Sequence, residues 1–311
     1  MKWGQQAVLV TGGGGFIGSH LVAKLVELGV AVSVITRSVS EKLSGVSPKI
    51  QLIQKDLGEA LRDNLLQLSD YNIIFHLSGN PYVPPSVEDP VYDYNMNLHT
   101  TFQLLEQLRH QKRQPRVIYA SSAAVYGNPK HMPIHEDDPT FPISPYGVSK
   151  LAAERYLAVY SQLYGLRGSS LRMFSVFGPG QRKQVVFDML IKLQANPLQI
   201  EVLGDGSQAR DFCYISDVIH AMLVVAENAP GQGEVYNVAS GESHSISELV
   251  QILCRLCDVQ PDITYTGQIR QGETERWTVD ISALCGIGFQ PSVSFEEGLR
   301  RVKAWYDQTF R

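Results

Sequence analysis

A tyrosine and a lysine stand four positions apart in the motif Tyr146-Gly-Val-Ser-Lys150. Residues four apart lie on one face of a helix, so on a helix this phenol and this ammonium would project together. A nearby ammonium favours the phenolate and lowers the pKa of a tyrosine from about 10 towards neutral, which makes the phenol a usable general base. Ser122 ends an apolar run and could hydrogen-bond the oxygen that reacts with this base. Taken alone, the pair also suits an ordinary amphipathic helix, so its meaning depends on the rest of the chain.

A glycine-rich segment, Thr11–Gly18, follows an apolar run near the start of the chain and precedes a helical pattern. Its glycines are spaced for three separate tasks. Gly12 permits a tight turn, Gly15 lets the backbone approach a pyrophosphate, and Gly18 lets the helix pack closely on a sheet. The helix would then direct unpaired N–H groups and the positive end of its dipole at the phosphates. In this strand–turn–helix context the segment predicts a dinucleotide site.

The end of the second apolar run bears on which nicotinamide dinucleotide binds. An acidic residue is usual there for NAD, whereas this chain has Thr36, Arg37 and Ser38. A guanidinium beside hydroxyl groups suits a 2′-phosphate, so these residues favour NADP over NAD. Alternatively, Arg37 stacks over the adenine while other groups hold an NAD ribose. Asp56 and Leu57 follow the third run, where the carboxylate either meets the adenine amino group or caps a helix.

Alternating strands and helices must position these groups. Buried strands are predicted at Ala7–Thr11, Val30–Thr36, Ile50–Gln54, Ile73–Leu77, Val117–Ala120 and Gly168–Phe174. Helical spacing of apolar residues predicts helices at Phe16–Leu28, Ala60–Leu68, Val91–Leu108 and Gly147–Tyr164. Parallel strands need crossovers, so this alternation predicts an α/β fold, a doubly wound parallel sheet of the Rossmann type. The glycine segment, Ser122 and Tyr146 all fall beyond strand carboxyl ends, where such sheets bind ligands.

After about residue 175 the pattern becomes irregular and rich in breakers. We expect a dinucleotide-binding domain over residues 1–174 and a smaller substrate-binding portion over 175–311. A helix at Asp217–Glu227 and a strand at Glu234–Val238 are expected to return to the first domain, so that it also uses residues of about 210–240 and the two parts interleave.

Composition narrows the classes of function. The 311 residues are 44% apolar and 19% charged with a formal net charge of −4, which is ordinary for a globular protein and disfavours a nucleic-acid partner. No apolar run is long enough for a transmembrane helix, and the strand near the first residue leaves no room for a signal peptide, so a cytoplasmic location is expected. Cys213, Cys254, Cys257 and Cys285 lack the partners of a zinc site, and neither a metal nor a disulfide framework is expected.

Seven motifs in chain order resemble those of the extended short-chain dehydrogenases/reductases, specifically the NAD-dependent epimerase/dehydratase family that acts on nucleotide sugars. They comprise Thr11–Gly18, His76–Gly79 with Asn97, Ser121–Gly127, Tyr146–Lys150, Arg172–Gly180, Gly204–Asp211 and Arg270–Glu273. The resemblance runs nearly from end to end. It implies that Ser122, Tyr146 and Lys150 form the catalytic set. The cofactor contacts expected from the motifs and the resemblance are Gly12, Gly15, Phe16, Ile17, Gly18, Thr36, Arg37, Ser38, Asp56, Leu57, Leu77, Ser78, Asn97, Tyr146 and Lys150.

The residues after Ser122 indicate the type of reaction within this family. The 4,6-dehydratases carry an Asp-Glu pair there and related decarboxylases keep the Glu, whereas this chain has Ala123 and Ala124. A methyl group neither donates nor accepts a proton, so both eliminations are disfavoured. The alanines resemble those of 4-epimerases, which oxidise a sugar transiently to the 4-ketone and return the hydride. An NADPH-dependent 4-keto-sugar reductase is the main alternative, favoured by Arg37, and a non-catalytic dinucleotide-binding scaffold the remote one.

A nucleotide-diphosphate sugar needs cations that hold its phosphates, and arginine suits this better than lysine. The resemblance implies Arg210 and Arg270 for the diphosphate, with Arg182 and Arg172 as weaker candidates. The other expected substrate contacts are Ser86, Ser122, Ala123, Tyr146 and Ser175. Ser175 stands where the family usually has Asn, so its contact with the diphosphate would be shorter or lost. Relatives commonly pair through two helices, so a homodimer through Val91–Leu108 and Gly147–Tyr164 is expected.

Overall fold

A parallel sheet of seven strands forms the base of the molecule in the computed structural model, which describes residues 1–268 and 276–310. The order across the sheet is β10-β6-β5-β4-β1-β2-β3. The strands are β1 (Ala7–Thr11), β2 (Ala31–Thr36), β3 (Gln51–Gln54), β4 (Ile73–His76), β5 (Arg116–Ser122), β6 (Gly168–Met173) and β10 (Gln232–Val238). The predicted doubly wound sheet is therefore confirmed.

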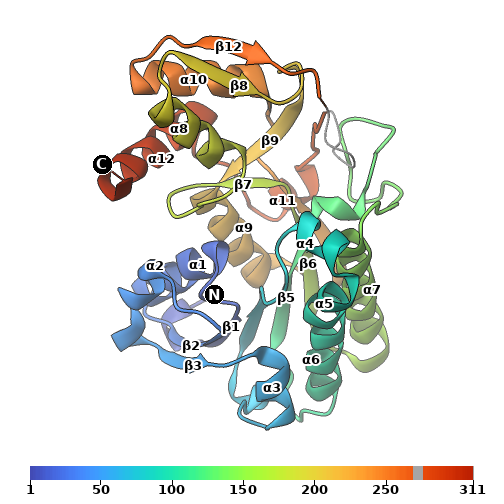
Figure 1. Cartoon of the computed structure of the whole chain (residues 1–311). Coiled ribbons are helices and arrows are strands. Elements are labelled where there is room, and N and C mark those ends of the chain that lie inside the picture. Colours follow the sequence, from blue (N-terminus) through green and yellow to red (C-terminus); the bar gives the residue numbers. More distant parts are fainter. Residues whose placement is uncertain (269–275, 311) are drawn as a thin grey trace.

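Helices cover both faces of this sheet (Figure 1). Along β1, Val8 and Val10 pack in the cluster that contains α1 (Phe16–Glu27) and α9 (Ile215–Asn228), whereas Leu9 packs in the opposite cluster. The opposite cluster contains α3 (Leu57–Arg62), α6 (Thr100–Arg109) and α7 (Pro145–Tyr164). Because side chains alternate across a strand and both faces are buried, the strands are nearly continuous apolar runs.

The strand order reverses between β1 and β4, which lie side by side although two strands separate them in the chain. The chain moves outward from β1 to β2 and β3, and from β4 to β5 and β6 in the other direction. The loops that follow β1 and β4 therefore diverge at this point and leave space between them. Ligands of open α/β sheets bind at such a switch point.

Two predicted helices differ from the structure. The stretch predicted as one helix over Val91–Leu108 consists of α5 (Pro90–Asp93), a π-helical segment (Tyr94–His99) and α6. The helix predicted from Ala60 begins at Leu57, because the Asp56 carboxylate accepts the backbone N–H of Gly58 and so starts the helix earlier. A short helix, α4 (Val83–Glu88), precedes α5, and α2 (Glu41–Ser44) follows β2.

The remaining elements form a smaller layered part beside the sheet (Figure 1). Its three-stranded sheet has the order β11-β9-β7, and β8 pairs in parallel with β12. The strands are β7 (Ser175–Phe177), β8 (Gln199–Val202), β9 (Ala209–Tyr214), β11 (Ser243–Ser245) and β12 (Asp262–Tyr265), and the helices are α8 (Val185–Ala195), α10 (Ile246–Cys257), α11 (Ser282–Gly286) and α12 (Phe295–Phe310). Between these elements the chain returns to the large sheet as β10, which pairs with β6.

Across residues 1–268 and 276–310, no helix combines the length and hydropathy needed to cross a membrane. No disulfide joins the four cysteines, all of which lie in the described residues, and Cys254 and Cys257 lie on α10. In the same part of the chain, no group of three or more metal-ligating side chains is clustered.

Candidate active site

A cleft of about 900 Å³ opens at the switch point of the large sheet. It is bounded by the glycine loop after β1, the loops after β2, β3 and β4, the end of β5, the first turns of α7, and the segment from β7 to α8. Fifteen of the residues predicted for catalysis or cofactor binding line it together: Gly12, Gly15, Phe16, Ile17, Gly18, Thr36, Arg37, Ser38, Asp56, Leu57, Leu77, Ser78, Ser122, Tyr146 and Lys150.

The glycine loop has the geometry of a phosphate cradle. Gly12 has a φ of +73°, and a Cβ there would lie 2.8 Å from the backbone of Leu77. A Cβ on Gly18 would collide with the carbonyl oxygen of Gly12, so only glycine lets α1 approach the loop this closely. The first residues of α1, Phe16–Gly18, line the cleft. No side chain caps this end of α1, and no acidic residue occupies its first turn. The free N–H groups of that turn therefore fit a pyrophosphate.

The residues that favoured NADP are engaged with the protein. The Thr36 hydroxyl donates to the carbonyl oxygen of Ser38 at 2.8 Å and is buried. The Arg37 guanidinium donates to the Tyr92 hydroxyl at 3.3 Å, across the cleft rim on α5. Asp56 lines the cleft and also caps α3, with its Oδ1 2.9 Å from the Gly58 nitrogen. Ser38, in contrast, is exposed and lines the cleft.

The N-terminus of α7 holds Tyr146 in place. Pro145 occupies the first turn, where its missing N–H is no cost, and the Ser144 hydroxyl accepts the backbone N–H of Gly147 at 3.1 Å. The Ser86 hydroxyl accepts the backbone N–H of Tyr146 at 3.1 Å and donates to the carbonyl of Val83. Tyr146 is thus fixed by its own helix and by α4.

Lys150 follows one turn later on α7 and is 5% exposed. Its Nζ donates to the carbonyl oxygen of Ala120 on β5 at 2.9 Å and lies 5.8 Å from the centre of the Tyr146 ring. The Ser122 side chain lies near enough to the Tyr146 phenol to lower the pKa of Tyr146. The structure therefore brings the three predicted catalytic side chains together at one end of the cleft.

Burial dominates the electrostatics of this group. It raises the pKa of Tyr146 to about 12, although the hydrogen bond from Ser122 lowers it and the charge of Asp93 adds to the rise. Burial also lowers the pKa of Lys150 to about 8, against the raising effects of Asp93 and Glu154. The sequence predicted a lowered tyrosine pKa. In the protein alone that prediction is wrong, because removing the phenolate from water outweighs its stabilising neighbours.

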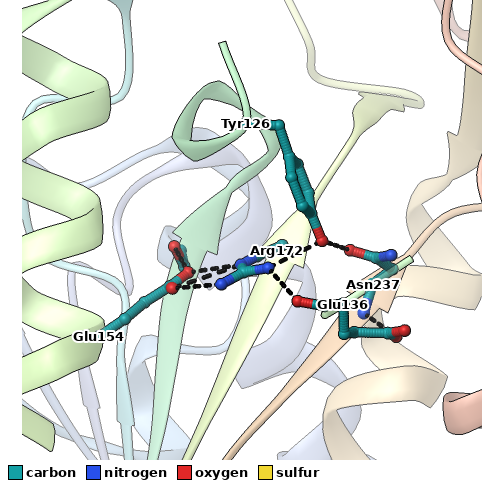
Figure 2. Close-up of polar contacts among 6 residues, drawn as sticks. Tyr126, Glu136, Glu154, Arg172 and Asn237 are labelled. Atoms are coloured by element: carbon teal, nitrogen blue, oxygen red, sulfur yellow. Dashed lines mark hydrogen bonds and ion pairs between the residues drawn. The ribbon is translucent and has the colours of Figure 1, made fainter. Parts of the chain in front are cut away.

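A buried polar network lies beside the catalytic group. Figure 2 shows Arg172 on β6 between the Glu154 carboxylate of α7 and, on its other side, Tyr126 and Glu136. The Arg172–Glu154 pair is 2.9 Å apart and both side chains are 2% exposed. Glu154 also accepts the Ser121 hydroxyl, next to Ser122. Arg172 was a weaker candidate for the diphosphate, and its guanidinium is instead held within this network.

Asn97, predicted to contact the cofactor, is completely buried and does not line the cleft. Its amide donates to Asp93 at 2.7 Å, and its Oδ1 lies 2.1 Å from the position that a Cβ on Gly79 would take. Gly79 itself lines the cleft, so Asn97 lies directly behind the wall. His76 is also buried, between the hydroxyls of Thr11 and Thr101, and burial lowers its pKa to about 3.

Several predicted substrate contacts lie outside the cleft lining. Ser86 is completely buried beneath Tyr146. Ala123 packs in a core cluster with Tyr126 and Phe174, while Ala124 faces the cleft. Ser175 alternates with Phe174 and Val176, which line the cleft, so the strand directs Ser175 to the other side.

Arg182 and Arg210 also lie outside the cleft lining. Arg182 is exposed, 3.8 Å from Glu41, and lies over the Phe310 ring. Arg210 lies on β9, where it donates to the carbonyl of Ala209. Arg270 falls outside the described residues. A cation that the sequence reasoning missed, Lys183, lines the cleft and lies 4.6 Å from the centre of the Tyr82 ring. No motif marked Lys183, because it lies beyond the end of the Arg172–Gly180 motif.

Two relatives of known name match almost the whole chain. The UDP-glucose 4-epimerase of Mycolicibacterium smegmatis is 32% identical over 96% of this chain and 97% of its own. The GDP-6-deoxy-D-mannose reductase of Pseudomonas aeruginosa is 30% identical over 98% of this chain and 99% of its own. The chain is thus about equally similar to a protein named as an epimerase and to one named as a reductase.

Solved structures agree with the fold. The UDP-N-acetylglucosamine 4-epimerase from Methanobrevibacter ruminantium, in complex with UDP-N-acetylmuramic acid, superposes with a TM-score of 0.89 at 32% identity, covering 98% of this chain and 99% of that one. The UDP-glucose 4-epimerase from Thermus thermophilus in complex with NAD gives 0.86 at 31% identity, covering 97% and 99%.

The model of the NAD dependent epimerase/dehydratase family matches residues 8–239, from β1 to the end of β10. That span includes the glycine loop, Ser122, Tyr146 and Lys150, and so all of the catalytic end of the cleft. The chain belongs to the NAD dependent epimerase/dehydratase family.

Proposed function

We propose that the protein is a UDP-sugar 4-epimerase that inverts C4 through a transient 4-keto sugar, with NAD as its resident cofactor. The proposal rests on the groups that line one cleft. The uncapped N-terminus of α1 lies in the same cleft as Ser122, Tyr146 and Lys150, and Ala124 presents only a methyl group beside them. The cleft therefore has a base for the oxidation and reduction of an alcohol, but it lacks the acid and base that elimination of water requires.

The protein's own groups would handle position and protons. The Ser122 hydroxyl holds the C4 oxygen, and the Tyr146 phenolate removes the proton from the C4 hydroxyl. Lys150 keeps positive charge beside the phenol and so favours its deprotonation. The glycine loop and the first turn of α1 hold the pyrophosphate of NAD. When bound, NAD supplies a reversible hydride acceptor whose oxidised ring is positively charged. After rotation of the keto sugar, the Tyr146 phenol returns the proton to the C4 oxygen.

NAD is proposed rather than NADP. The sequence favoured NADP through Thr36, Arg37 and Ser38, but the Thr36 hydroxyl and the Arg37 guanidinium both have protein partners. The structural neighbour from Thermus thermophilus is a complex with NAD. The NADP prediction therefore has no support. Arg37, at the cleft rim beside Tyr92, is suited to cover the adenine ring, which was the alternative interpretation of this residue.

A keto-sugar reductase is the second candidate, favoured by the 30% identity to the GDP-6-deoxy-D-mannose reductase. The two reactions differ in stoichiometry. An epimerase regenerates its cofactor in every cycle, whereas a reductase consumes one reduced cofactor for each product. The same chemistry at Tyr146 serves both, so only turnover distinguishes them.

The test is incubation of the purified protein with UDP-glucose, UDP-galactose, UDP-N-acetylglucosamine and UDP-glucuronic acid, each followed by proton NMR and by absorbance near 340 nm. A 4-epimerase gives the C4 epimer of at least one of these sugars at constant absorbance. Steady consumption of added NADPH or NADH with a 4-keto sugar, without epimerisation, would contradict the epimerase and support the reductase. The Tyr146→Phe variant serves as the control.

We further propose that residues 175–311 bind most of the sugar nucleotide and that the protein is a homodimer. Support for the dimer is the exposed face of α7, where Tyr156, Val159 and Leu163 are 41%, 45% and 68% exposed. Light scattering at micromolar concentration tests it, and a monomer would exclude it.

A further inference from the structure

The Asp93 carboxylate, at the end of α5, is completely buried. Its Oδ1 accepts the side-chain amides of Asn80 at 2.9 Å and Asn97 at 2.7 Å. Its Oδ2 has no hydrogen-bond partner, and among the described residues no cation lies within 4.0 Å of either oxygen. A buried carboxylate without an ion pair is costly unless other charge compensates it. Asp93 therefore needs an explanation beyond packing.

The α7 helix carries a buried cation, Lys150, and α5 and the following π-helical segment pack against this helix. One Lys150 hydrogen bond goes to Ala120, which leaves two of its three N–H donors for other groups. The ionisable groups around Lys150 are Tyr119 and His76 on the sheet, Tyr146 and Glu154 on α7, and Asp93. Tyr119 and His76 carry no negative charge at neutral pH.

Of the two carboxylates near Lys150, only Asp93 lacks a cation of its own. Glu154 lies 2.9 Å from the Arg172 guanidinium. The opposite charges of this pair therefore largely cancel in their effect on Lys150. The charge of Asp93 is not cancelled in this way, and the low local dielectric extends its reach. Asp93 also lies on the far side of Asn80, a residue that lines the cleft.

We propose that the Asp93 carboxylate is the buried counter-charge of the Lys150 ammonium, held by Asn80 and Asn97, and that it is a positioning residue that acts on the reaction through Lys150 and Tyr146. This role rests on the proposed function, because those two residues are the catalytic pair there. Asp93 does not touch the substrate. It sets the protonation of the two groups that do.

The Asp93 charge shifts the pKa values of Lys150 and Tyr146 in the same direction. Asp93 raises the pKa of Lys150, and it also raises the pKa of Tyr146. Removal of the charge therefore lowers both pKa values together. A residue with a merely structural role would lower the height of a pH–rate profile without moving it.

The test is the isosteric change Asp93→Asn, with Asp89→Asn as the matched control. Asp89 is exposed, caps the same helix and carries the same charge, and asparagine caps as well as aspartate. For Asp93→Asn, both limbs of the pH profile of kcat/KM are expected to move to lower pH by about one unit. For Asp89→Asn, the profile is expected to stay within about 0.2 units of the parent, since water screens an exposed charge. Limbs that do not move in Asp93→Asn overturn the proposal.

A second measurement does not depend on turnover. With 13Cε-labelled lysine, the Lys150 signal, assigned by its loss in Lys150→Met, gives the pKa of Lys150 in the protein as purified. The parent value is expected near 8, and Asp93→Asn is expected to lower it by about one unit. An unchanged Lys150 titration overturns the counter-charge even if the protein epimerises sugars. A lowered titration upholds it even if no epimerisation is found, so the two failures are distinguishable.

If Asp93→Asn does not fold, the melting temperature of the double variant Asp93→Asn/Lys150→Met is compared with that of Lys150→Met. Lys150→Met leaves the Asp93 charge without its partner, and the additional change at Asp93 is expected to raise the melting temperature above that of Lys150→Met alone. A further fall in the double variant would show that the two charges are not coupled and would overturn the proposal.

Discussion

Replacement of Arg172 by methionine tests the buried pair shown in Figure 2. The change removes the cation that lies 2.9 Å from Glu154, together with donors to Tyr126 and to the carbonyl of Glu136. Because Arg172 and Glu154 are each 2% exposed, water cannot replace the lost partner. Loss of one member of such a pair costs about 3–5 kcal/mol of the free energy of unfolding.

The expected change in melting temperature follows from chain length. A protein of 311 residues has an unfolding entropy of roughly 650 cal/mol/K, so a loss of about 3–5 kcal/mol lowers the melting temperature by about 5–8 °C. Glu154 binds the hydroxyl of Ser121, next to Ser122, so the same variant is also expected to lower kcat.

The assay is urea unfolding followed by circular dichroism, with Arg172→Met, Glu154→Gln and the double variant compared. Removal of both charges is expected to cost less than the sum of the single changes by at least about 2 kcal/mol. Lys24→Met is the control, because its ion pair with Glu27 at 3.0 Å is exposed and is worth less than about 1 kcal/mol. A loss below about 1 kcal/mol in Arg172→Met, or strict additivity in the double variant, would show that the Arg172–Glu154 pair does not stabilise the fold in this way.

Three further predictions concern the cleft. Gly18→Ala places a Cβ against the carbonyl oxygen of Gly12, so NAD affinity is expected to fall at least about tenfold by calorimetry, and a change within twofold would be inconsistent with the close approach. Ser122→Ala removes the hydrogen bond that lowers the pKa of Tyr146, so kcat is expected to fall about 100-fold with the acid limb moved to higher pH, and an unmoved limb would contradict this. Ser86→Ala leaves the buried N–H of Tyr146 without its acceptor and is expected to cost about 1–3 kcal/mol in urea unfolding, whereas no loss would show that another acceptor replaces it.

The sheet and the cofactor loop were predictable because their signals are local. Val8 and Leu9 belong to a short apolar run that is typical of a strand buried on both faces, and Gly18 is required by a contact with Gly12 in the same loop. The Tyr146–Lys150 pair was predictable for the same reason, since helix geometry alone aligns it.

Contacts between distant segments were not predictable in this way. Ser86 resembled a substrate contact, yet it holds the backbone of Tyr146, 60 positions further along the chain. Asp93 carries no motif, and its burial depends on Asn80 and on how α5 packs against α7. Thr36 and Arg37 favoured a phosphate by residue type, but local turn geometry and Tyr92 engage them first. Burial likewise decided the pKa of Tyr146, and burial depends on the whole fold.

In the proposed reaction, C4 of the sugar is oxidised and reduced within one cleft, with Tyr146 as the base. The most direct measurement is the fate of deuterium in UDP-[4-2H]glucose, and of solvent deuterium in a parallel reaction of the unlabelled sugar in D2O. Transient oxidation with return of the same hydride predicts that the label stays at C4 of the galactose product and that no solvent deuterium enters there, with turnover lost in Tyr146→Phe. Loss of the label from C4, or entry of solvent deuterium at C4, would contradict it.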